Sequence, residues 1–385
     1  MRHFQLLRAS ALTCIILSGF YFLSAQRQLK LKYNASNVYA GIEVGAKGVK
    51  LSILEIAKDA KATGSFAILK DTSVNTDFIS FKHPNFDATL DGLYGLYNMV
   101  IKEYKIPAKR VFTVISSGVK MQADKENKKE WLTNLIDSFK LRTKDPKRQV
   151  EIVDVADEAR LSHLGIVADN ERYNTFLIDI GSGNTKGGYF PYGNTNDFKL
   201  FQINWGTKST TTAAEKKCGE DKSLVNFNKQ LGRIVAEAED KDIIYAVNES
   251  GAYPKSDNIS FSGGIAWSVA TLLHPELNER STVPVTYDEV AAFCDKLYTD
   301  FNSYSDFFLI KNIKDRSIDL DAAAKEIKRV HGVFDQHSLM AGSRLLLKIM
   351  RQFESVNEKK EFFLVKNGQV GWVSAYVDKI INDKD

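Results

Sequence analysis

The chain has 385 residues, a length that two domains of ordinary size would fill. Its composition, 44% hydrophobic and 26% charged, is typical of a globular protein, and a net charge of +4 without a basic arm argues against nucleic-acid binding. The three cysteines form no CxxC or His/Cys cluster, which argues against a structural zinc site. Cys218 and Cys294 would be able to pair only in an oxidising compartment, and the sequence leaves that pairing open.

Residues 1–26 have the pattern of a signal peptide or a membrane anchor. Arg2 and Arg8 precede an uncharged apolar run of 17 residues from Ala9 to Ala25, which ends in small residues. That length is at the lower limit for crossing a bilayer, so cleavage and anchoring both stay open, with a buried N-terminal helix as the third alternative. In the first two cases we expect the body to be exported from the cytoplasm and, if uncleaved, held at a membrane. Residues 27–37 are polar and basic and predict a linker.

A strand, a tight turn and a second strand follow the linker. Residues 38–45 predict the first strand, and residues 49–56 alternate polar and apolar as a returning strand. The next segments alternate between the helical and extended patterns, which indicates an α/β domain. The predicted helices span 91–104, 126–139 and 156–167, and the predicted strands span 110–115 and 150–155.

The most informative stretch runs from Leu177 to Gly188. An apolar run at 175–178 predicts a buried strand, Asp179 follows it, and a glycine-rich turn then leads to a second strand near 189–190. Such a turn aims backbone N–H groups at one anion, usually a phosphate, and an acid at the strand end can hold a metal ion. A hairpin with a purely structural role would have a similar sequence. Because the first hairpin has the same order of strand, acid, glycine, tip and strand, the sequence indicates two related halves.

The remaining segments continue the α/β pattern. Gly263 and Gly264 separate a short strand from a helix, a place where N–H groups favour an anion. Thr286 is the expected N-cap of a helix that follows Pro284. The predicted elements are strands at 198–203, 259–262 (running into the Gly pair) and 361–365, helices at 265–273, 286–298, 320–330 and 338–353, and a capping segment at 207–212.

These motifs resemble the exopolyphosphatase/guanosine pentaphosphate phosphatase (Ppx/GppA) family of the actin-like ATPase-domain (ASKHA) superfamily. Asp157-Glu158-Ala159-Arg160-Leu161 matches a Glu-Glu-Ala-Arg-Leu helix that stands about twenty residues before that family's second phosphate loop, and Glu158 precedes Asp179 by 21. The resemblance covers residues 38–376. Four further motifs follow in the family's order, namely Ile115–Lys120, Ser262–Ile265, Met340–Ser343 and Gly368–Trp372. It implies an α/β fold of two ribonuclease H-like (actin-like) domains, 38–170 and 171–385, with a cleft between them.

The sequence departs from the family at both phosphate loops. The first loop has Glu43 and then Gly45-Ala46-Lys47-Gly48, where the family has an Asp and Gly-Ser-Asn-Ser. In the second loop Lys186 replaces a carboxylate that the family uses toward metal, and Lys120 replaces an Arg.

The resemblance implies a phosphoanhydride hydrolase that acts on polyphosphate or nucleotide polyphosphates. Glu158 would orient the attacking water, and Asp179 with Glu43 would hold a divalent ion, by default Mg²⁺. The residues expected to contact phosphate are Gly45, Lys47, Lys120, Gly181, Ser182, Gly183, Thr185, Lys186, Gly263 and Gly264. Because of the altered loops, a polyanion-binding or scaffold protein without turnover remains the alternative, followed by an actin-like filament or ATPase. The sequence also leaves a homodimer open.

Overall fold

The computed structural model describes residues 29–46, 48–57, 66–355, 358–366, 368, 371–373 and 375–376. The predicted signal peptide or anchor and Lys47 lie outside these ranges. Within them, no helix has the length and apolar character that crossing a membrane requires.

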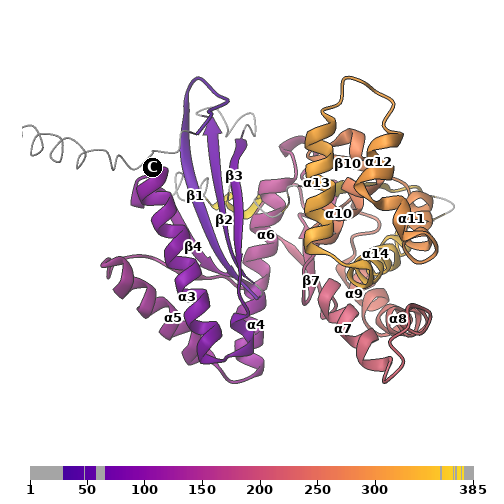
Figure 1. Ribbon diagram of the computed structural model, residues 1–385, viewed down its shortest axis with the longest axis horizontal. Coiled ribbons are helices and arrows are strands. Elements are labelled where there is room, and N and C mark those ends of the chain that lie inside the picture. The colour runs from indigo at the N-terminus through magenta and orange to yellow at the C-terminus, as the bar shows by residue number, and fades with distance from the viewer. Residues whose placement is uncertain are drawn as a thin grey trace, which may run out of the picture.

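The first half is a five-stranded mixed sheet with helices packed on it (Figure 1). The strand order is β3-β2-β1-β4-β5, in which β1, β2 and β3 are antiparallel neighbours and β4 and β5 run parallel to β1. The strands are β1 Ser36–Gly45, β2 Gly48–Ala57, β3 Phe66–Asn75, β4 Val111–Ile115 and β5 Glu151–Ile152. The helices are α3 His83–Asn98, α4 Ser117–Lys125, α5 Lys129–Thr143 and α6 Val155–Ile166.

The second half is a six-stranded sheet of order β10-β11-β9-β6-β7-β8. Its strands are β6 Thr175–Ile180, β7 Thr185–Tyr189, β8 Lys199–Ile203, β9 Asn258–Ser262, β10 Thr282–Val285 and β11 Glu361–Val365. Its helices are α7 Thr207–Lys217, α8 Leu224–Ala238, α9 Ile244–Ser250, α10 Gly264–Leu273, α11 Tyr287–Thr299, α12 Asp306–Asn312, α13 Leu320–Val333 and α14 Gln336–Arg351. Two halves, each with its own sheet, confirm the predicted α/β class and are consistent with two actin-like domains.

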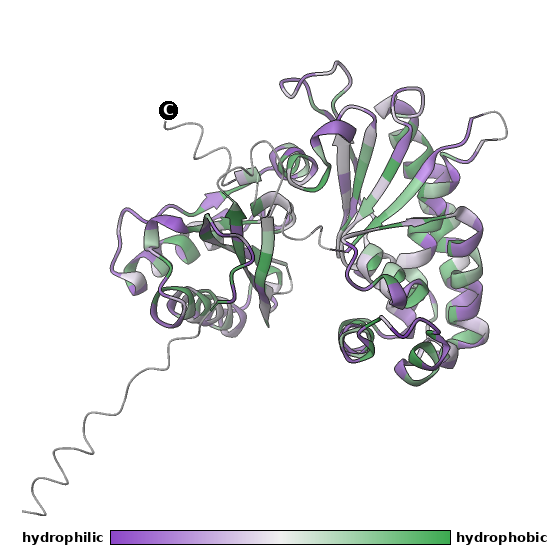
Figure 2. Cartoon of the chain, turned by 90° about the horizontal axis from the view of Figure 1, so that it is seen from above, coloured by the Kyte–Doolittle hydropathy of each residue, from purple (hydrophilic) through white to green (hydrophobic). Residues whose placement is uncertain are grey.

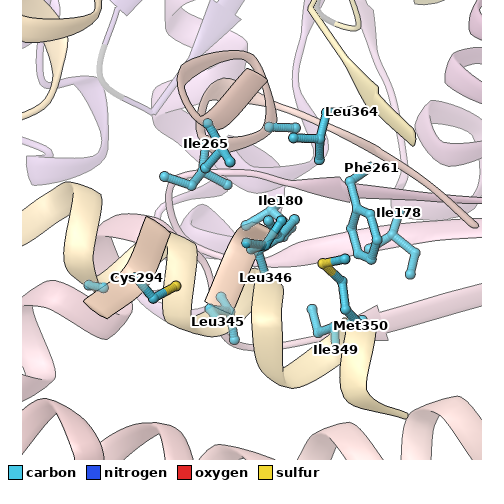
Figure 3. Packing of buried hydrophobic residues seen from close by; sticks show 14 of the residues in the cluster. Ile178, Ile180, Phe261, Ile265, Cys294, Leu345, Leu346, Ile349, Met350 and Leu364 are labelled. Carbon is cyan, nitrogen blue, oxygen red and sulfur yellow. The ribbon is translucent and has the colours of Figure 1, made fainter. Parts of the chain in front are cut away.

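Each half has its own buried core. In the second half, α14 lays Leu346 and Met350 against Ile178, Ile180 and Phe261 of the sheet (Figure 3). The helices carry both hydrophobic and hydrophilic residues (Figure 2), as expected for helices that cover a sheet and face water. Burial of each large apolar side chain contributes about 1.5–3 kcal/mol, so these cores hold the two hairpins in fixed positions.

The last described residues return to the first sheet. Trp372, Val373 and Tyr376 belong to one buried cluster with residues of β1, β2 and β4. A Cβ atom at Gly41 would lie 2.6 Å from Cγ2 of Val373, so only glycine lets this segment approach β1 so closely. The C-terminal segment therefore contacts the half of the molecule formed by the N-terminal strands.

Several local predictions are confirmed, and others are corrected. The hairpin strands and the helix capped by Thr286 form as predicted, with Glu289 completing a capping box. The strand predicted at 150–155 is shorter, because Asp154 caps α6 by accepting the N–H of Asp157. Gly206, rather than a residue of 207–212, is the N-cap of α7. Strands β3 and β10 and helices α4, α8, α9 and α12 were not predicted.

Two features bear on the N-terminal linker and on the cysteines. The end of the predicted linker is held on the sheet, because the Glu55 carboxylate accepts the backbone N–H groups of Lys32 and Tyr33 at 2.6 Å and 3.0 Å. Cys218 and Cys294 are buried free thiols, so the disulfide that the sequence left open is not formed in this structure.

Candidate functional site

Each glycine hairpin places an acid directly opposite a lysine. In β1–β2, Glu43 pairs with Lys50, and in β6–β7, Asp179 pairs with Lys186. Side chains of directly opposed residues project from the same face of a sheet, so each hairpin presents one carboxylate and one ammonium group together. Lys50 was not predicted as a site residue.

Glu158 lies in the first turn of α6, where a negative charge is favoured by the helix dipole. Its Oε1 lies 2.6 Å from Nζ of Lys186, and its Oε2 accepts the backbone N–H of Ser117 at 2.9 Å. The Glu158 side chain is 13% exposed and that of Lys186 is 8% exposed, so the ion pair is nearly enclosed. The pair joins the helix between the sheets to the second glycine hairpin.

The ion pair sets the protonation states of its two members. Burial by itself raises the pKa of Glu158, but the charge and hydrogen bond of Lys186 and the Ser117 N–H outweigh it and hold that pKa below its ordinary value. Burial lowers the pKa of Lys186, but the charges of Glu158, Asp179 and Glu43 outweigh it and raise that pKa. Both groups are therefore charged at neutral pH. Since Lys186 is influenced by Glu158, Asp179 and Glu43, the two hairpins and α6 converge on one site.

The second glycine loop folds back on the start of α7. The carbonyl oxygen of Gly181 accepts the N–H of Thr207, and that of Ser182 accepts the N–H groups of Lys208 and Ser209. Thr185 is fully buried, and its hydroxyl donates to the carbonyl oxygen of Trp205 at 2.7 Å. The predicted phosphate donor Thr185 is thus engaged within the fold, and so is the Gly181 N–H, which donates to the carbonyl oxygen of Asn184 at 3.0 Å. The phosphate contacts expected of Ser182 and Gly183 remain predictions.

A close approach of the ends of β6 and β9 positions Asp179. Its Oδ1 accepts the Ser262 hydroxyl hydrogen at 3.1 Å, across the β6–β9 pairing. Gly263 has φ +94°, and a Cβ there would lie 2.3 Å from the carbonyl oxygen of Ile180 and 2.9 Å from Oδ1 of Asp179. Glycine is therefore required at 263 to hold this acid in place. Gly264 follows as the first residue of α10.

A small hollow lies beside Glu158. Its polar lining is formed by Glu43, Ser116 and Glu158. The apolar lining is Val114, Val153, Leu161 and Trp372. Its volume of about 10 Å³ is close to the minimum that one water molecule occupies, and although Glu43, Ser116 and Glu158 border it, the surface that faces the hollow is almost entirely apolar.

The acids at this site do not form a ready-made divalent-ion site. Within the described ranges, no three His, Cys, Asp or Glu side chains gather closely enough to hold a metal ion. Asp179 and Glu43 provide two carboxylates, and their charges act on the ammonium groups of Lys50 and Lys186. Because ammonium groups repel a cation and donate no lone pair, this donor set does not fit a preformed Mg²⁺ site, and the predicted cofactor is not confirmed.

The remaining residues near the site include one predicted lysine and several residues that the sequence did not predict. Lys120 lies half-buried on α4, the helix that also supplies Ser117. Asp71 of β3 and Arg329 of α13 form an ion pair of 2.9 Å between the two halves, which the sequence did not indicate. The sequence analysis did not predict Ser117 or Ser262 as site residues. Both fall within motifs that carry the family resemblance, and that position was the signal that could have identified them. For Lys50 the only signal in the sequence was its position seven residues after Glu43, the same spacing as between Asp179 and Lys186.

Comparison with solved structures identifies the fold. A Ppx/GppA family member from Aquifex aeolicus superposes with a TM-score of 0.62 at 16% identity, covering 91% of this chain and 99% of that one. An exopolyphosphatase from Cytophaga hutchinsonii has a TM-score of 0.55 at 14% identity, covering 88% of this chain and 98% of that one. Neither a protein-family model nor a curated protein matches the sequence. The chain therefore has the two-domain fold of the Ppx/GppA proteins, and the resemblance predicted from its motifs is confirmed at the level of fold.

Proposed function

We propose that the protein hydrolyses phosphoanhydride bonds of polyphosphate or nucleotide polyphosphates, and that Glu158 orients the attacking water. The observation that carries this proposal is the position of Glu158, a nearly enclosed carboxylate bound to Lys186 at the point where the charges of Glu43 and Asp179 also act. The likeness to an exopolyphosphatase supports it only by analogy of fold, since one fold serves many functions.

The chemistry needs a positioned water and a neutralised phosphate chain more than it needs a strong base. In the reaction, the water oxygen forms a bond to the terminal phosphorus while the bridging P–O bond breaks, and the leaving phosphate takes the electron pair. Glu158 is ionised because of Lys186, so it accepts a hydrogen bond from the water and can hold the released proton. Backbone N–H groups at the tip of the second glycine loop, those of Ser182 and Gly183, would contact the phosphate oxygens.

A binding protein without turnover is the second candidate, and one observation favours it. Both oxygens of the Glu158 carboxylate already accept a hydrogen bond, one from Lys186 and one from the Ser117 N–H. A carboxylate with a lowered pKa and two donors is a weaker proton acceptor than a free one. The same fold would then hold a polyanion without cleaving it.

Phosphate release separates the two candidates. The full chain, purified in a mild detergent because of its apolar N-terminal run, is incubated with tripolyphosphate, long-chain polyphosphate and nucleotides, with and without Mg²⁺. We expect Glu158→Gln to lower the rate by about 10²–10⁴-fold, the usual contribution of a positioned acid or base. Asp157→Asn is the matched control, since Asp157 is the neighbouring acid of the same helix and is exposed.

Circular dichroism must show that each variant is folded before its rate is compared. Unchanged release by a folded Glu158→Gln variant would remove Glu158 from the mechanism. Tight binding of polyphosphate by the wild-type protein, without release from any of these substrates, would select the second candidate.

A further inference from the structure

The two hairpins carry the same spacing of charges. Glu43 is followed by Gly45 at two residues and Lys50 at seven, and Asp179 is followed by Gly181 at two residues and Lys186 at seven. In both hairpins the acid and the lysine are paired across the strands. The internal repeat therefore supplies two equivalent carboxylate–ammonium pairs, one from each half.

The two lysines differ in what holds them. Lys186 is nearly enclosed and is bound to Glu158. Lys50 is exposed and makes no ion pair with any residue in the part of the chain that the structure describes. The charge of Glu43 raises the pKa of Lys50. Although the residue is exposed overall, nearby protein atoms partly desolvate its ammonium group, which opposes that rise, and the charges of Asp179, Asp71 and Glu158 raise the pKa further. One ammonium of the repeat is thus used within the fold, and the other is available to a ligand.

We propose that Lys50 is the group that holds the phosphate chain, and that Lys50 and Lys186 supply the positive charge that a divalent ion would otherwise bring between Glu43 and Asp179. This inference rests on the proposed polyanionic ligand. It follows from the positions of the lysines, each opposite one of the two acids predicted to bind metal. The consequence is that the site binds its anion without Mg²⁺.

The Lys50 charge also determines how the site responds to a metal. Without it, Glu43 and Asp179 are left with less positive charge around them, and carboxylates repel phosphate. Glu43 would then have no ammonium group opposite it and could hold Mg²⁺ through one or two oxygens and water, the way that ion is usually bound beside phosphates. Lys50→Met should therefore create a dependence on Mg²⁺ that the wild-type protein lacks.

Calorimetric titration with imidodiphosphate, a P–N–P analogue of pyrophosphate that resists hydrolysis, tests this on the full chain in detergent. In EDTA we expect Lys50→Met to raise Kd by about 10–100-fold, the loss of a hydrogen bond to a charged group, and Lys50→Arg to retain most of the affinity. Mg²⁺ should change the wild-type Kd by less than about threefold and restore part of the affinity of Lys50→Met. Lys70→Met is the matched control, because Lys70 is an exposed lysine of the same sheet that pairs with Ile53 rather than with an acid.

Each other outcome has a distinct meaning. Wild-type binding that appears only with Mg²⁺, or equal binding by wild type and Lys50→Met in EDTA, overturns the inference and leaves the proposed function standing. If the wild-type protein binds neither imidodiphosphate nor tripolyphosphate under either condition, the polyanionic ligand itself is wrong, and the proposed function fails with it.

Discussion

The buried pair of Glu158 and Lys186 makes a quantitative prediction about stability. Lys186→Met removes the ammonium group and keeps a side chain of similar length. It leaves the Glu158 carboxylate, 13% exposed, with the Ser117 backbone N–H as its donor. Glu158→Gln is the reverse change and leaves the ammonium group, 8% exposed, with Asp179 opposite it on the neighbouring strand.

The magnitude follows from burial and distance. Breaking a buried pair from one side typically costs about 3–5 kcal/mol, because the remaining charge stays desolvated. Here Asp179 partly compensates Lys186 and Lys50 partly compensates Glu158, so we expect each single variant to lose about 3 kcal/mol of unfolding free energy. The double variant has neither charge, and we expect it to lie within about 1–2 kcal/mol of the wild-type protein.

Urea unfolding at neutral pH, followed by tryptophan fluorescence, gives the four free energies of a double-mutant cycle. The expected coupling energy is about 4–5 kcal/mol, the sum of the two single losses minus the loss of the double variant. If both single variants unfold within about 1 kcal/mol of the wild-type protein, water reaches the pair and the reasoning from burial is wrong. If the double variant is as unstable as the sum of the singles, the side chains act by packing and not by charge.

Two further predictions concern other buried positions. Burial lowers the pKa of His163 from 6.5 to about 4, so the unfolded chain binds its proton first as the pH falls, and unfolding free energy should drop by about 2 kcal/mol between pH 7 and pH 5. In parallel urea titrations at the two pH values, His163→Gln should lose that part of the drop, and an identical drop in the variant would assign it to other groups. Gly263→Ala should destabilise the fold by at least about 1–3 kcal/mol because of its positive φ and the Ile180 oxygen, whereas Gly95→Ala, in an open helical position, should stabilise it by about 0.5–1 kcal/mol. Equal effects of the two alanines in thermal unfolding would contradict the geometry at 263.

Much of the fold was predictable because its signals are local. The hairpin strands alternate or run apolar, Thr286 and Glu289 form a capping box four residues long, and α14 repeats leucine at helical spacing. Strand β3 was missed because its second half, Lys70-Asp71-Thr72-Ser73-Val74-Asn75, is largely polar in sequence. It forms a strand because it pairs with β2, and pairing with a neighbour is not visible in a single segment.

The candidate site was predictable only in part. The resemblance nominated Glu43, Glu158 and Asp179, and the structure brings the charges of all three to bear on Lys186. Lys50 was missed because a lysine at an alternating strand position has the pattern of a residue that merely faces water. The carboxylates of Asp71 and Asp179, whose charges act on Lys50, come from other strands, so no sequence spacing shows that they lie near it.

The sequence by itself determined the two glycine hairpins, their acids and the order of the elements around them, because turns, caps and hydrophobic periodicity act over a few residues. Only the tertiary structure decided that Lys186 binds Glu158, 28 residues away, while Lys50 stays exposed under the charges of Glu43, Asp179 and other carboxylates. The reason is that the energy of a charge depends on burial and on its nearest partners, and both are fixed by how α6 packs between the two sheets.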